Sequence, residues 1–526
     1  METEPRAVGL ILSGRYVDQN LAREFGKIPP AFLPIGEMRL IELQVKELGK
    51  YAEFIYLTLP SNYKISEFDQ ILLEEMNVKI LQTEPNLSIA KGISTAIRQI
   101  GSSRIHPLIL LYGDTLCTIP MQANSIAGSM TPAFYEWGEF NSQIEIDKAK
   151  DDNTIALVGA SRIQFVPQFL EILESGEEGI LPLLEEYINL TKAKIEIVET
   201  WFDFGHVATY FESRKSLQQS RHFNSIKIID DHVYKQSNDS VKIEAEYQWY
   251  KNVPEEMSIY FPRVTGKQES GYSTEYLRAP TLQELIVFTD HDLKIWKIIF
   301  KSISNYFLVS TKAVHAKNFK NEHDDFSRLI KDKTLKRFSQ IEWDQIGKFL
   351  GTDQQKLFMD SKRILDFCLD SLSEWDGMSN GVLHGDMCAT NIFWDSHNLK
   401  IKLIDPRGID SEGNLMSSGN IAYDIAKLYQ SFVFNYEYII CSRYKLDYTD
   451  QANPGIRVYK TKNQRQISEL FVEFMKGIPK FQEEKIRQLA TLLLFSLIPL
   501  HNDRPDRQAA FLILALGQSE EEIGSR

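Results

Sequence analysis

The feature that most constrains the fold of this chain is a short loop that carries an acid and an amide and is followed by a second acid. The loop Val382-Leu-His-Gly-Asp-Met-Cys-Ala-Thr-Asn391 contains Asp386, and Asp405 lies fourteen residues beyond Asn391. Apolar runs at 392–394 and 401–404 predict two short strands. A hairpin of these strands would carry Asn391 and Asp405 to the same end, where one metal ion could contact both.

This set of side chains is the one that phosphoryl transfer from a nucleotide requires. One carboxylate, here Asp386, would accept the proton of the attacking hydroxyl, while Asn391 and Asp405 would hold the Mg²⁺ that bridges the phosphates of ATP. His384 precedes Asp386 by two residues and is expected to orient the loop by hydrogen bonding. The alternative is a surface loop with scattered acids, which the spacing and the flanking strand patterns disfavour.

The motif His384-Gly-Asp386, with Asn391 and Ile404-Asp405, resembles the aminoglycoside phosphotransferase and choline kinase superfamily. Protein kinases have His-Arg-Asp in this loop, so the glycine indicates a small-molecule substrate. The resemblance implies a bilobal, protein-kinase-like α+β domain over residues 221–515.

The same resemblance assigns roles to residues upstream of the loop. The N-lobe strands would be 226–229 and 232–235, which places Lys235 against the α- and β-phosphates of ATP. A helix over 243–250 would supply the acid that pairs with this lysine, with Glu246 preferred and Glu244 left open. Segment 272–277 resembles the hinge that receives adenine, which implicates Glu275 and Leu277. Downstream, Asp424 is expected to brace the C-lobe.

The first 215 residues alternate between strand-like and helical patterns. Alternation of this kind predicts an α/β domain with a mostly parallel, doubly wound sheet and its ligand outside the carboxyl ends of the strands. The polar run 213–220 is the expected boundary between this domain and the next. The predicted strands are 7–12, 53–59, 107–112, 154–159 and 195–198, and the clearest helical patterns are 39–48 and 65–76.

Three segments of this domain resemble sugar-phosphate nucleotidyltransferases. Gly14 and Arg15 follow the first strand, where that family has a phosphate-binding loop. Asp114 ends a strand in Gly-Asp, and Asp203 lies in a Trp-x-Asp-x-Gly turn. The resemblance implies that these two acids bind one Mg²⁺. It also implies that a phosphomonoester attacks the α-phosphate of a nucleoside triphosphate, CTP or another, and releases pyrophosphate.

The chain departs from that family at the phosphate-binding loop. Of the family's two loop glycines only Gly14 remains, and Pro30 stands at the usual lysine position. Lys27 or Arg23 could replace the missing charge, and Arg15 could hold the triphosphate. Two interpretations therefore stay open, an active nucleotidyltransferase and a catalytically silent, regulatory domain of the same fold.

Composition limits the partners and the cellular location that we expect for this chain. The formal net charge is −13, and no block of Lys and Arg interrupts it, which disfavours a nucleic-acid partner. The four cysteines have no paired spacing, which favours a reducing cytoplasm. No targeting segment is evident, and the longest apolar run, 489–500, falls short of the roughly 20 residues that a membrane span needs. We expect that run to form a buried helix of the C-lobe.

Together these patterns predict a cytoplasmic fusion of two enzymes acting in sequence. The kinase would phosphorylate a hydroxyl of a small alcohol or sugar, and the first domain would convert the phosphate into a nucleotide-linked precursor. Fusions of this kind resemble enzymes that supply bacterial capsules and lipopolysaccharides. One alternative is a kinase with a silent accessory domain. Another is a nucleotide-sensing scaffold in which neither half turns over, which the intact set of Asp386, Asn391 and Asp405 disfavours. Choline, ethanolamine, a polyol and a sugar all remain open as acceptors, as do the base of either nucleotide and oligomerisation.

Overall fold

The protein divides into two compact units, Met1–Leu217 and Gln218–Arg526. The division falls inside the polar run 213–220, of which residues 218–220 lie outside the described part of the chain. The computed structural model describes residues 7–102, 105–130, 155–175, 179–217, 224–316, 323–373, 375–409, 413–450 and 453–523.

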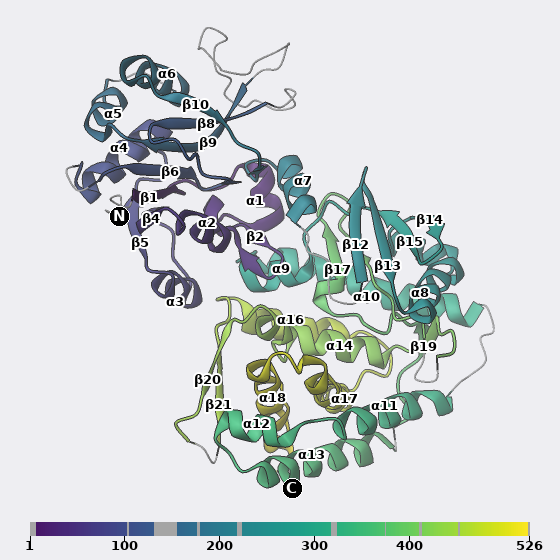
Figure 1. Ribbon diagram of the computed structural model, residues 1–526. Helices are drawn as coiled ribbons and strands as arrows, with labels where there is room; N and C mark the ends of the chain where they lie inside the picture. The colour runs from purple at the N-terminus through teal and green to yellow at the C-terminus, as the bar shows by residue number, and fades with distance from the viewer. Residues whose placement is uncertain are drawn as a thin grey trace. The chain divides into compact units, whose positions relative to one another are not determined.

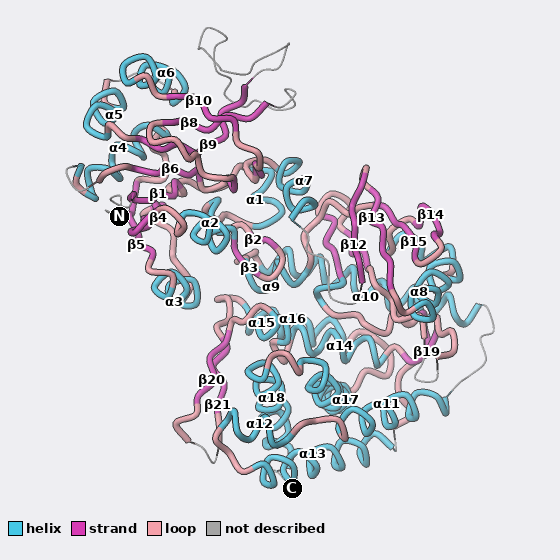
Figure 2. Tube along the Cα trace, in the orientation of Figure 1, coloured by secondary structure: helices cyan, strands magenta, loops and turns pink. Residues whose placement is uncertain are grey.

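The first unit is built on a seven-stranded sheet with the order β10-β8-β9-β6-β1-β4-β5 (Figures 1 and 2). All neighbouring strands run parallel except where β9 pairs with β6 and with β8, so β9 is the antiparallel member. Its elements are β1 (Ala7–Leu12), α1 (Gln19–Phe25), β2 (Pro34–Ile35), β3 (Met38–Arg39), α2 (Leu40–Leu48), β4 (Ala52–Pro60), α3 (Glu67–Glu75), β5 (Val78–Thr83), α4 (Ile89–Ile100), β6 (Leu108–Tyr112), β7 (Thr115–Cys117), β8 (Ser125–Met130), β9 (Ile155–Ile163), α5 (Val166–Leu173), α6 (Ile180–Thr191), β10 (Lys194–Ile197), β11 (Trp201–Asp203) and α7 (Val207–Leu217).

Alternate side chains of the central strands enter two separate cores, one on each face of the sheet. Leu10 and Leu110 pack with α4, α5 and α6 on one face. Ile11 and Leu111 pack with α2 and α3 on the other. This two-sided burial follows from the period of two along a strand, and it explains why β1 and β6 are apolar at nearly every position.

The five predicted strands of this unit all occur, with ends that differ by a few residues. The prediction of a mixed α/β architecture dominated by parallel strands is confirmed. The strand expected at 154–159 extends to Ile163, and its first residue, 154, lies outside the described residues. The antiparallel direction of β9 was not predicted, because residue alternation does not encode strand direction.

The second unit begins with a four-stranded antiparallel sheet of order β12-β13-β15-β14. Helix α8 packs against β13 and β15 of this sheet. The remaining chain is mostly helical. The elements are β12 (Asn224–Ile229), β13 (His232–Ser237), α8 (Ser240–Asn252), β14 (Val264–Gln268), β15 (Gly271–Glu275), α9 (Leu282–Phe288), α10 (Leu293–Ala316), α11 (His323–Phe338), α12 (Trp343–Leu350), α13 (Gln354–Ser373), β16 (Asn380–Val382), η4 (Ala389–Asn391), β17 (Ile392–Asp395), β18 (Lys400–Leu403), β19 (Ser418–Asn420), α14 (Ala422–Phe432), α15 (Tyr436–Ile440), β20 (Tyr444–Asp447), β21 (Gly455–Val458), α16 (Gln464–Lys476), α17 (Glu483–Leu497) and α18 (Pro505–Ile523).

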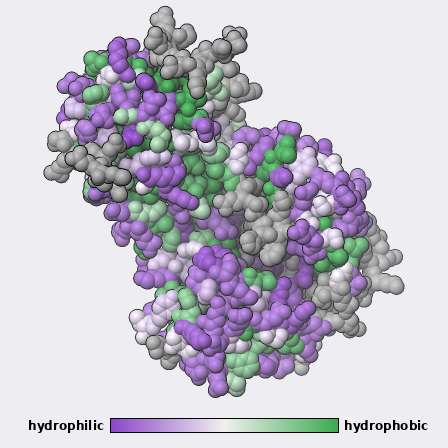
Figure 3. Space-filling view, in the orientation of Figure 1, coloured by the Kyte–Doolittle hydropathy of each residue, from purple (hydrophilic) through white to green (hydrophobic). Residues whose placement is uncertain are grey.

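One continuous hydrophobic core joins the helices of the second unit. Its centre is α17, in which every residue from Gln488 to Leu497 is buried. The apolar run 489–500 is therefore a core element up to Leu497, and the α-helix ends just before Pro499. Among the described residues, no helix is long and apolar enough to cross a membrane. In the view of Figure 3, hydrophilic side chains cover most of the visible face of this unit.

Candidate active sites

The loop that follows β16 is held in place by hydrogen bonds to Asp424, near the start of α14. Its carboxylate accepts hydrogen bonds from the backbone N–H groups of His384, at 2.7 Å, and Gly385, at 2.8 Å. Gly385 has a φ of 78°, and a Cβ there would lie 2.8 Å from the Cβ of Arg407. Glycine at this position is thus required by the backbone and by its neighbour.

His384 is fully buried and joins the loop to the strand that precedes Asp405. Its Nε2 lies 2.9 Å from the carbonyl oxygen of Ile404, and its Nδ1 lies 3.3 Å from the backbone nitrogen of Asp386. Burial lowers the pKa of His384 to about 4, so the ring is neutral at pH 7, and we assign the proton to Nε2, with Nδ1 as acceptor. These bonds are of the loop-orienting kind expected from the sequence.

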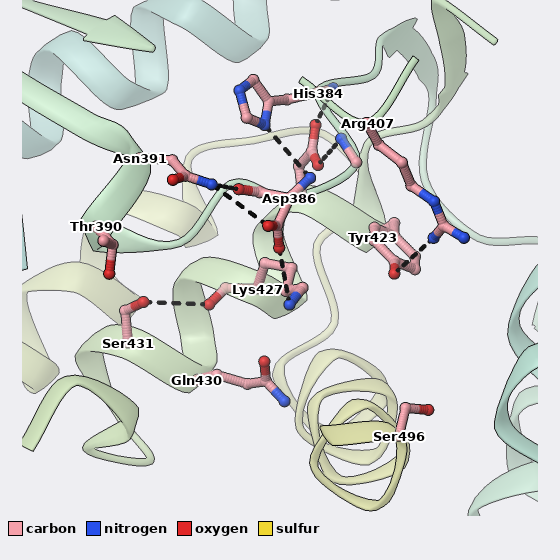
Figure 4. Close-up of polar contacts among 12 residues, drawn as sticks. His384, Asp386, Thr390, Asn391, Arg407, Tyr423, Lys427, Gln430, Ser431 and Ser496 are labelled. Atoms are coloured by element: carbon pink, nitrogen blue, oxygen red, sulfur yellow. Dashed lines mark hydrogen bonds and ion pairs between the residues drawn. The ribbon is translucent and has the colours of Figure 1, made fainter. Parts of the chain in front are cut away.

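The side chain of Asp386 points at Lys427 of α14 (Figure 4). Its Oδ1 lies 3.0 Å from the Lys427 ammonium, and 47% of the side chain remains exposed. Burial alone would raise the pKa of Asp386, but the Lys427 charge and hydrogen bond outweigh it and lower the pKa to about 2. Asp386 is therefore ionised at neutral pH, so it can accept a hydrogen bond from an incoming hydroxyl.

The predicted hairpin forms, with Ile392 of β17 paired to Leu403 of β18. It places Asn391 next to Ile404, whose N–H donates to the Asn391 carbonyl at 3.0 Å. The Asn391 amide nitrogen donates to the backbone oxygen of Asp386 at 2.9 Å (Figure 4), which leaves the amide oxygen as the atom that could bind a cation. Asp405 follows in the left-handed region, with a φ of 59°, which aspartate tolerates better than most residues.

Lys235 of β13 and Glu246 of α8 form a buried ion pair of 2.6 Å. The same ammonium lies 2.9 Å from Oδ1 of Asp405, so three predicted site residues from distant parts of the chain meet at one point. Glu244, the alternative partner, instead pairs with Lys267 at the surface. Tyr272 adds a hydrogen bond to Glu246 at 3.1 Å.

The predicted adenine-binding segment lies at the end of β15 and in the loop after it. The backbone N–H of Glu275 donates to the carbonyl of Arg263 at 2.9 Å, and its side chain lies 3.5 Å from Lys402. Leu277 is half-buried in the loop. Their role in nucleotide binding stays a prediction.

The donor set at this site fits Mg²⁺. Asp405 offers a carboxylate and Asn391 an amide oxygen, both hard oxygen ligands, and the phosphates of a nucleotide would supply others. Among the described residues, no group of three or more His, Cys, Asp or Glu side chains forms a metal site from protein atoms alone.

In the first unit, the loop after β1 borders a cavity of about 270 Å³. Gly14 lines it, and a Cβ on this residue would lie 2.3 Å from the hydroxyl of Thr83 at the end of β5. Any larger residue would push the loop away from the sheet. Thr58 lies two residues before the end of β4. Its hydroxyl accepts a hydrogen bond from the N–H of Ser13 at 2.8 Å.

Two of the three cations predicted for this loop, Arg15 and Lys27, take different positions relative to the cavity. Arg15 lines the cavity, and its Nε donates to the carbonyl of Leu87 at 2.6 Å. Lys27 is not among the lining residues; its ammonium lies over the ring of Tyr16, 4.4 Å from the ring centre. Because Tyr16 lines the cavity, Lys27 is one side chain removed from it.

Asp114 and Asp203 come together beside the cavity. Thr115 of β7 pairs with Asp203 of β11, and the N–H of Phe204 donates to the carbonyl of Asp114 at 2.8 Å. A methyl group placed on Gly205 would lie 3.1 Å from one Asp114 oxygen and 3.2 Å from one Asp203 oxygen. Burial, and then the charge of Asp203, raise the pKa of Asp114 to about 6. Two crowded carboxylates, of which Asp114 has a raised pKa, form a donor set that suits a divalent cation.

Several residues of both sites escaped prediction. Thr58 and Thr83 were missed, although each lies near the end of a strand at the edge where ligands of such sheets bind. Lys427 was not assigned to the site; its signal was a cation three residues after Asp424, in a helix that proves to be buried at every position. Lys333 of α11 gave no signal, because nothing in the sequence places that helix near Asp386.

Comparison with known protein families and with curated proteins finds no match. Solved structures similar to the N-terminal region include HddC from Yersinia pseudotuberculosis, with 15% identity and a TM-score of 0.31 over 40% of this chain and 100% of that one. A putative glucose-1-phosphate thymidylyltransferase from Bacillus anthracis has 13% identity and a TM-score of 0.32 over 40% and 94%. CTP:phosphocholine cytidylyltransferase from Streptococcus pneumoniae has 13% identity and a TM-score of 0.31 over 41% and 100%. Because these TM-scores are low, the assignment of each site rests on its own residues.

Proposed function

We propose that the second unit transfers the γ-phosphoryl group of ATP to a hydroxyl of a small molecule. The observation that carries this proposal is the convergence of Lys235, Glu246 and Asp405, with ion pairs of 2.6 and 2.9 Å, from β13, α8 and the segment after β18. Lys235 would hold the α- and β-phosphates, and Asp405 with Asn391 would hold Mg²⁺, which neutralises charge on the phosphates.

In the chemical step the substrate oxygen forms a bond to Pγ while the bond from Pγ to the bridging β-oxygen breaks. ADP leaves, and the hydroxyl proton passes to Asp386 or from it to solvent. A carboxylate with a pKa of about 2 is a weak base. It therefore orients the hydroxyl at first and takes the proton only as the new O–P bond makes that proton acidic.

For the first unit we propose nucleotidyl transfer. A phosphate oxygen of the kinase product would attack the α-phosphorus of CTP or another nucleoside triphosphate, and pyrophosphate would leave. Support comes from the two adjacent carboxylates, Asp114 and Asp203, beside a cavity that is also lined by Gly14 and Arg15. The two steps together would yield a nucleotide-linked precursor, for which we propose a role in surface polysaccharide synthesis.

The second candidate is a kinase with a silent accessory domain. The position of Lys27 outside the cavity favours it, because Arg15 is then the only predicted cation that lines the described cavity.

A single set of variants tests both activities. Asp386→Asn should abolish ADP release and leave pyrophosphate release from added phosphorylated product intact, and Asp203→Asn should do the reverse. Asp344→Asn, at an exposed pair on α12, is the matched control and should leave both activities unchanged. Loss of both activities in either single variant would contradict two independent sites. If no pyrophosphate is released with ATP, CTP, GTP or UTP, the alternative of a kinase with a catalytically silent accessory domain is the one that remains.

A further inference from the structure

Four cations gather beside Asp386 on the side away from Asn391. Lys333 and Arg337 come from α11, Arg407 from the segment after Asp405, and Lys427 from α14; we call them the cation cluster. They surround the hydroxyl of Tyr423, which accepts hydrogen bonds from Lys333 at 2.6 Å and from Arg407 at 3.4 Å. Figure 4 shows Arg407 and Tyr423 on the opposite side of Asp386 from Asn391.

Among the described residues, Asp386 is the carboxylate that forms an ion pair with the cluster. Lys427 is paired with Asp386 at 3.0 Å. Lys333 has the Tyr423 hydroxyl as its partner, and Arg337 donates to the backbone carbonyl of Ser496 at 2.9 Å. In the described part of the chain, none of Lys333, Arg337 and Arg407 has a carboxylate within ion-pair distance.

Such crowding is costly without an anion. Burial, together with the charges of Arg407 and Lys427, lowers the pKa of the Lys333 ammonium to about 8, against the opposing effect of Tyr423. Burial also lowers the pKa of Arg337. Like charges held together in a partly dry site are stabilised when a ligand of opposite charge joins them.

The position of the cluster indicates whether the anion belongs to the nucleotide or to the acceptor. Asp386 uses Oδ1 to contact Lys427 and lies with Oδ2 3.4 Å from the Asn391 amide, so it stands between the metal ligands and the cluster. Nucleotide phosphates belong on the Asn391 side, with Asp405 and Lys235. An acceptor whose hydroxyl reaches Asp386 would extend from the opposite side, toward Tyr423.

We propose that the acceptor of the proposed kinase is an anion, a hydroxyl compound that also carries a phosphate or a carboxylate, and that Lys333 and Arg407, held in place by the buried Tyr423, bind this second group. The inference rests on the proposed kinase function and names its substrate class. Cationic amino alcohols such as choline and ethanolamine would be repelled by the cluster and are poor substrates. Neutral sugars and polyols would lack the charged contact.

The first experiment measures ADP release from the full chain with matched acceptors: glucose, glucuronate, glucose 6-phosphate, glycerol, glycerate, glycerol 3-phosphate, ethanolamine and choline. We expect kcat/KM for an anionic member to exceed that of its neutral counterpart by about ten- to hundredfold, the range of one or two charge-assisted hydrogen bonds. The carboxylate and phosphate members show which group is preferred. Turnover that is highest with choline or ethanolamine, or equal within each set, would overturn the proposal.

Variants then connect the preference to the cluster. Lys333→Met keeps the length and packing of the side chain and removes the charge, and Lys331→Met makes the same change at an exposed position of α11. We expect Lys333→Met to raise KM for the anionic acceptor about tenfold or more and to leave KM for ATP unchanged. An increase in the KM for ATP instead would assign the cluster to the nucleotide and overturn the proposal.

A binding measurement keeps the proposal testable without turnover. Inorganic phosphate should raise the Tm of the wild type and of Lys331→Met, and the increase should be smaller in Lys333→Met. Equal increases in all three proteins would overturn the anion site. Absence of ADP release with every acceptor would instead count against the proposed kinase function.

Discussion

Asp386 is the side chain on which the proposed phosphoryl transfer depends most directly. Asp386→Asn preserves the shape of the side chain but removes the proton acceptor, so we expect kcat for ADP release to fall by about 10²–10⁴. ATP affinity should persist, because Lys235 and Asp405 are untouched. Steady-state kinetics and nucleotide titration test both statements. Near-normal turnover would show that the loop 382–391 is not the reacting site.

The two proposed magnesium ligands, Asp405 and Asn391, should contribute unequally to Mg²⁺ binding. Asp405→Ala removes a carboxylate and Asn391→Ala a neutral amide, and a dication is bound more strongly by the charged group. We therefore expect the Mg²⁺ concentration for half-maximal ATP binding to rise more in Asp405→Ala. Titration of Mg²⁺ at fixed ATP compares them. If this Mg²⁺ concentration rises equally in both variants, or in neither, the assignment of Asp405 and Asn391 as metal ligands is wrong.

The buried partner of Lys235 can be tested against the exposed acid two residues before it. Glu246→Gln leaves the Lys235 ammonium with one carboxylate instead of two, in a buried site, and should lower the free energy of unfolding by about 2 kcal/mol. Glu244→Gln breaks only an exposed pair with Lys267 and should change it by less than about 0.5 kcal/mol. Urea unfolding measures both. Similar changes in the free energy of unfolding for the two variants would mean that the Lys235–Glu246 pair does not stabilise the fold.

One buried acid ties three elements of the second unit together. Glu437 of α15 accepts hydrogen bonds from the N–H of Ala389 at 3.0 Å, the hydroxyl of Thr390 at 3.0 Å and the hydroxyl of Ser431 at 2.7 Å. It therefore connects η4, which carries Asn391, to α14, which carries Lys427. Burial, outweighing these hydrogen bonds, raises its pKa to about 7.

This shift makes stability depend on pH. Because the pKa of Glu437 is higher in the folded than in the unfolded state, its contribution is fully present below about pH 4.5 and is lost as pH rises toward 7. The loss amounts to about 3 kcal/mol. Glu437→Gln cannot ionise, so its free energy of unfolding should lack this component between pH 4.5 and 7. Urea unfolding across that range provides the measurement, and parallel profiles for variant and wild type would contradict it.

Each unit has its own hydrophobic core, with the core residues of the first unit ending before residue 217 and those of the second beginning after it. We therefore expect residues 1–217 and 218–526, expressed separately, to fold and to unfold cooperatively. The proposed kinase activity should remain with the second fragment and pyrophosphate release with the first. Circular dichroism and the two product assays test this, and a fragment that fails to fold alone would show that its core is not sufficient.

Most of the elements and their order could be predicted from the sequence alone. Apolar runs of strand length and the helical period fixed β1, β4, β6, β12, β13 and the β17–β18 hairpin, because burial of these side chains is a local pattern. The hairpin also predicted that Asn391 and Asp405 share one end, since register follows from a short connection. The likeness of the motifs to known families supplied the roles of Lys235 and Asp386, which periodicity alone could not.

Which distant side chains meet depends on the tertiary structure. Lys235 reaches Asp405 as well as its expected partner Glu246, Lys427 turns toward Asp386, and Lys333 reaches Tyr423 across 90 positions of sequence. The chemistry of a lysine is the same whether it faces solvent or a reacting carboxylate. Its surroundings depend on how the helices pack, and packing depends on the summed burial of many residues far apart in the chain.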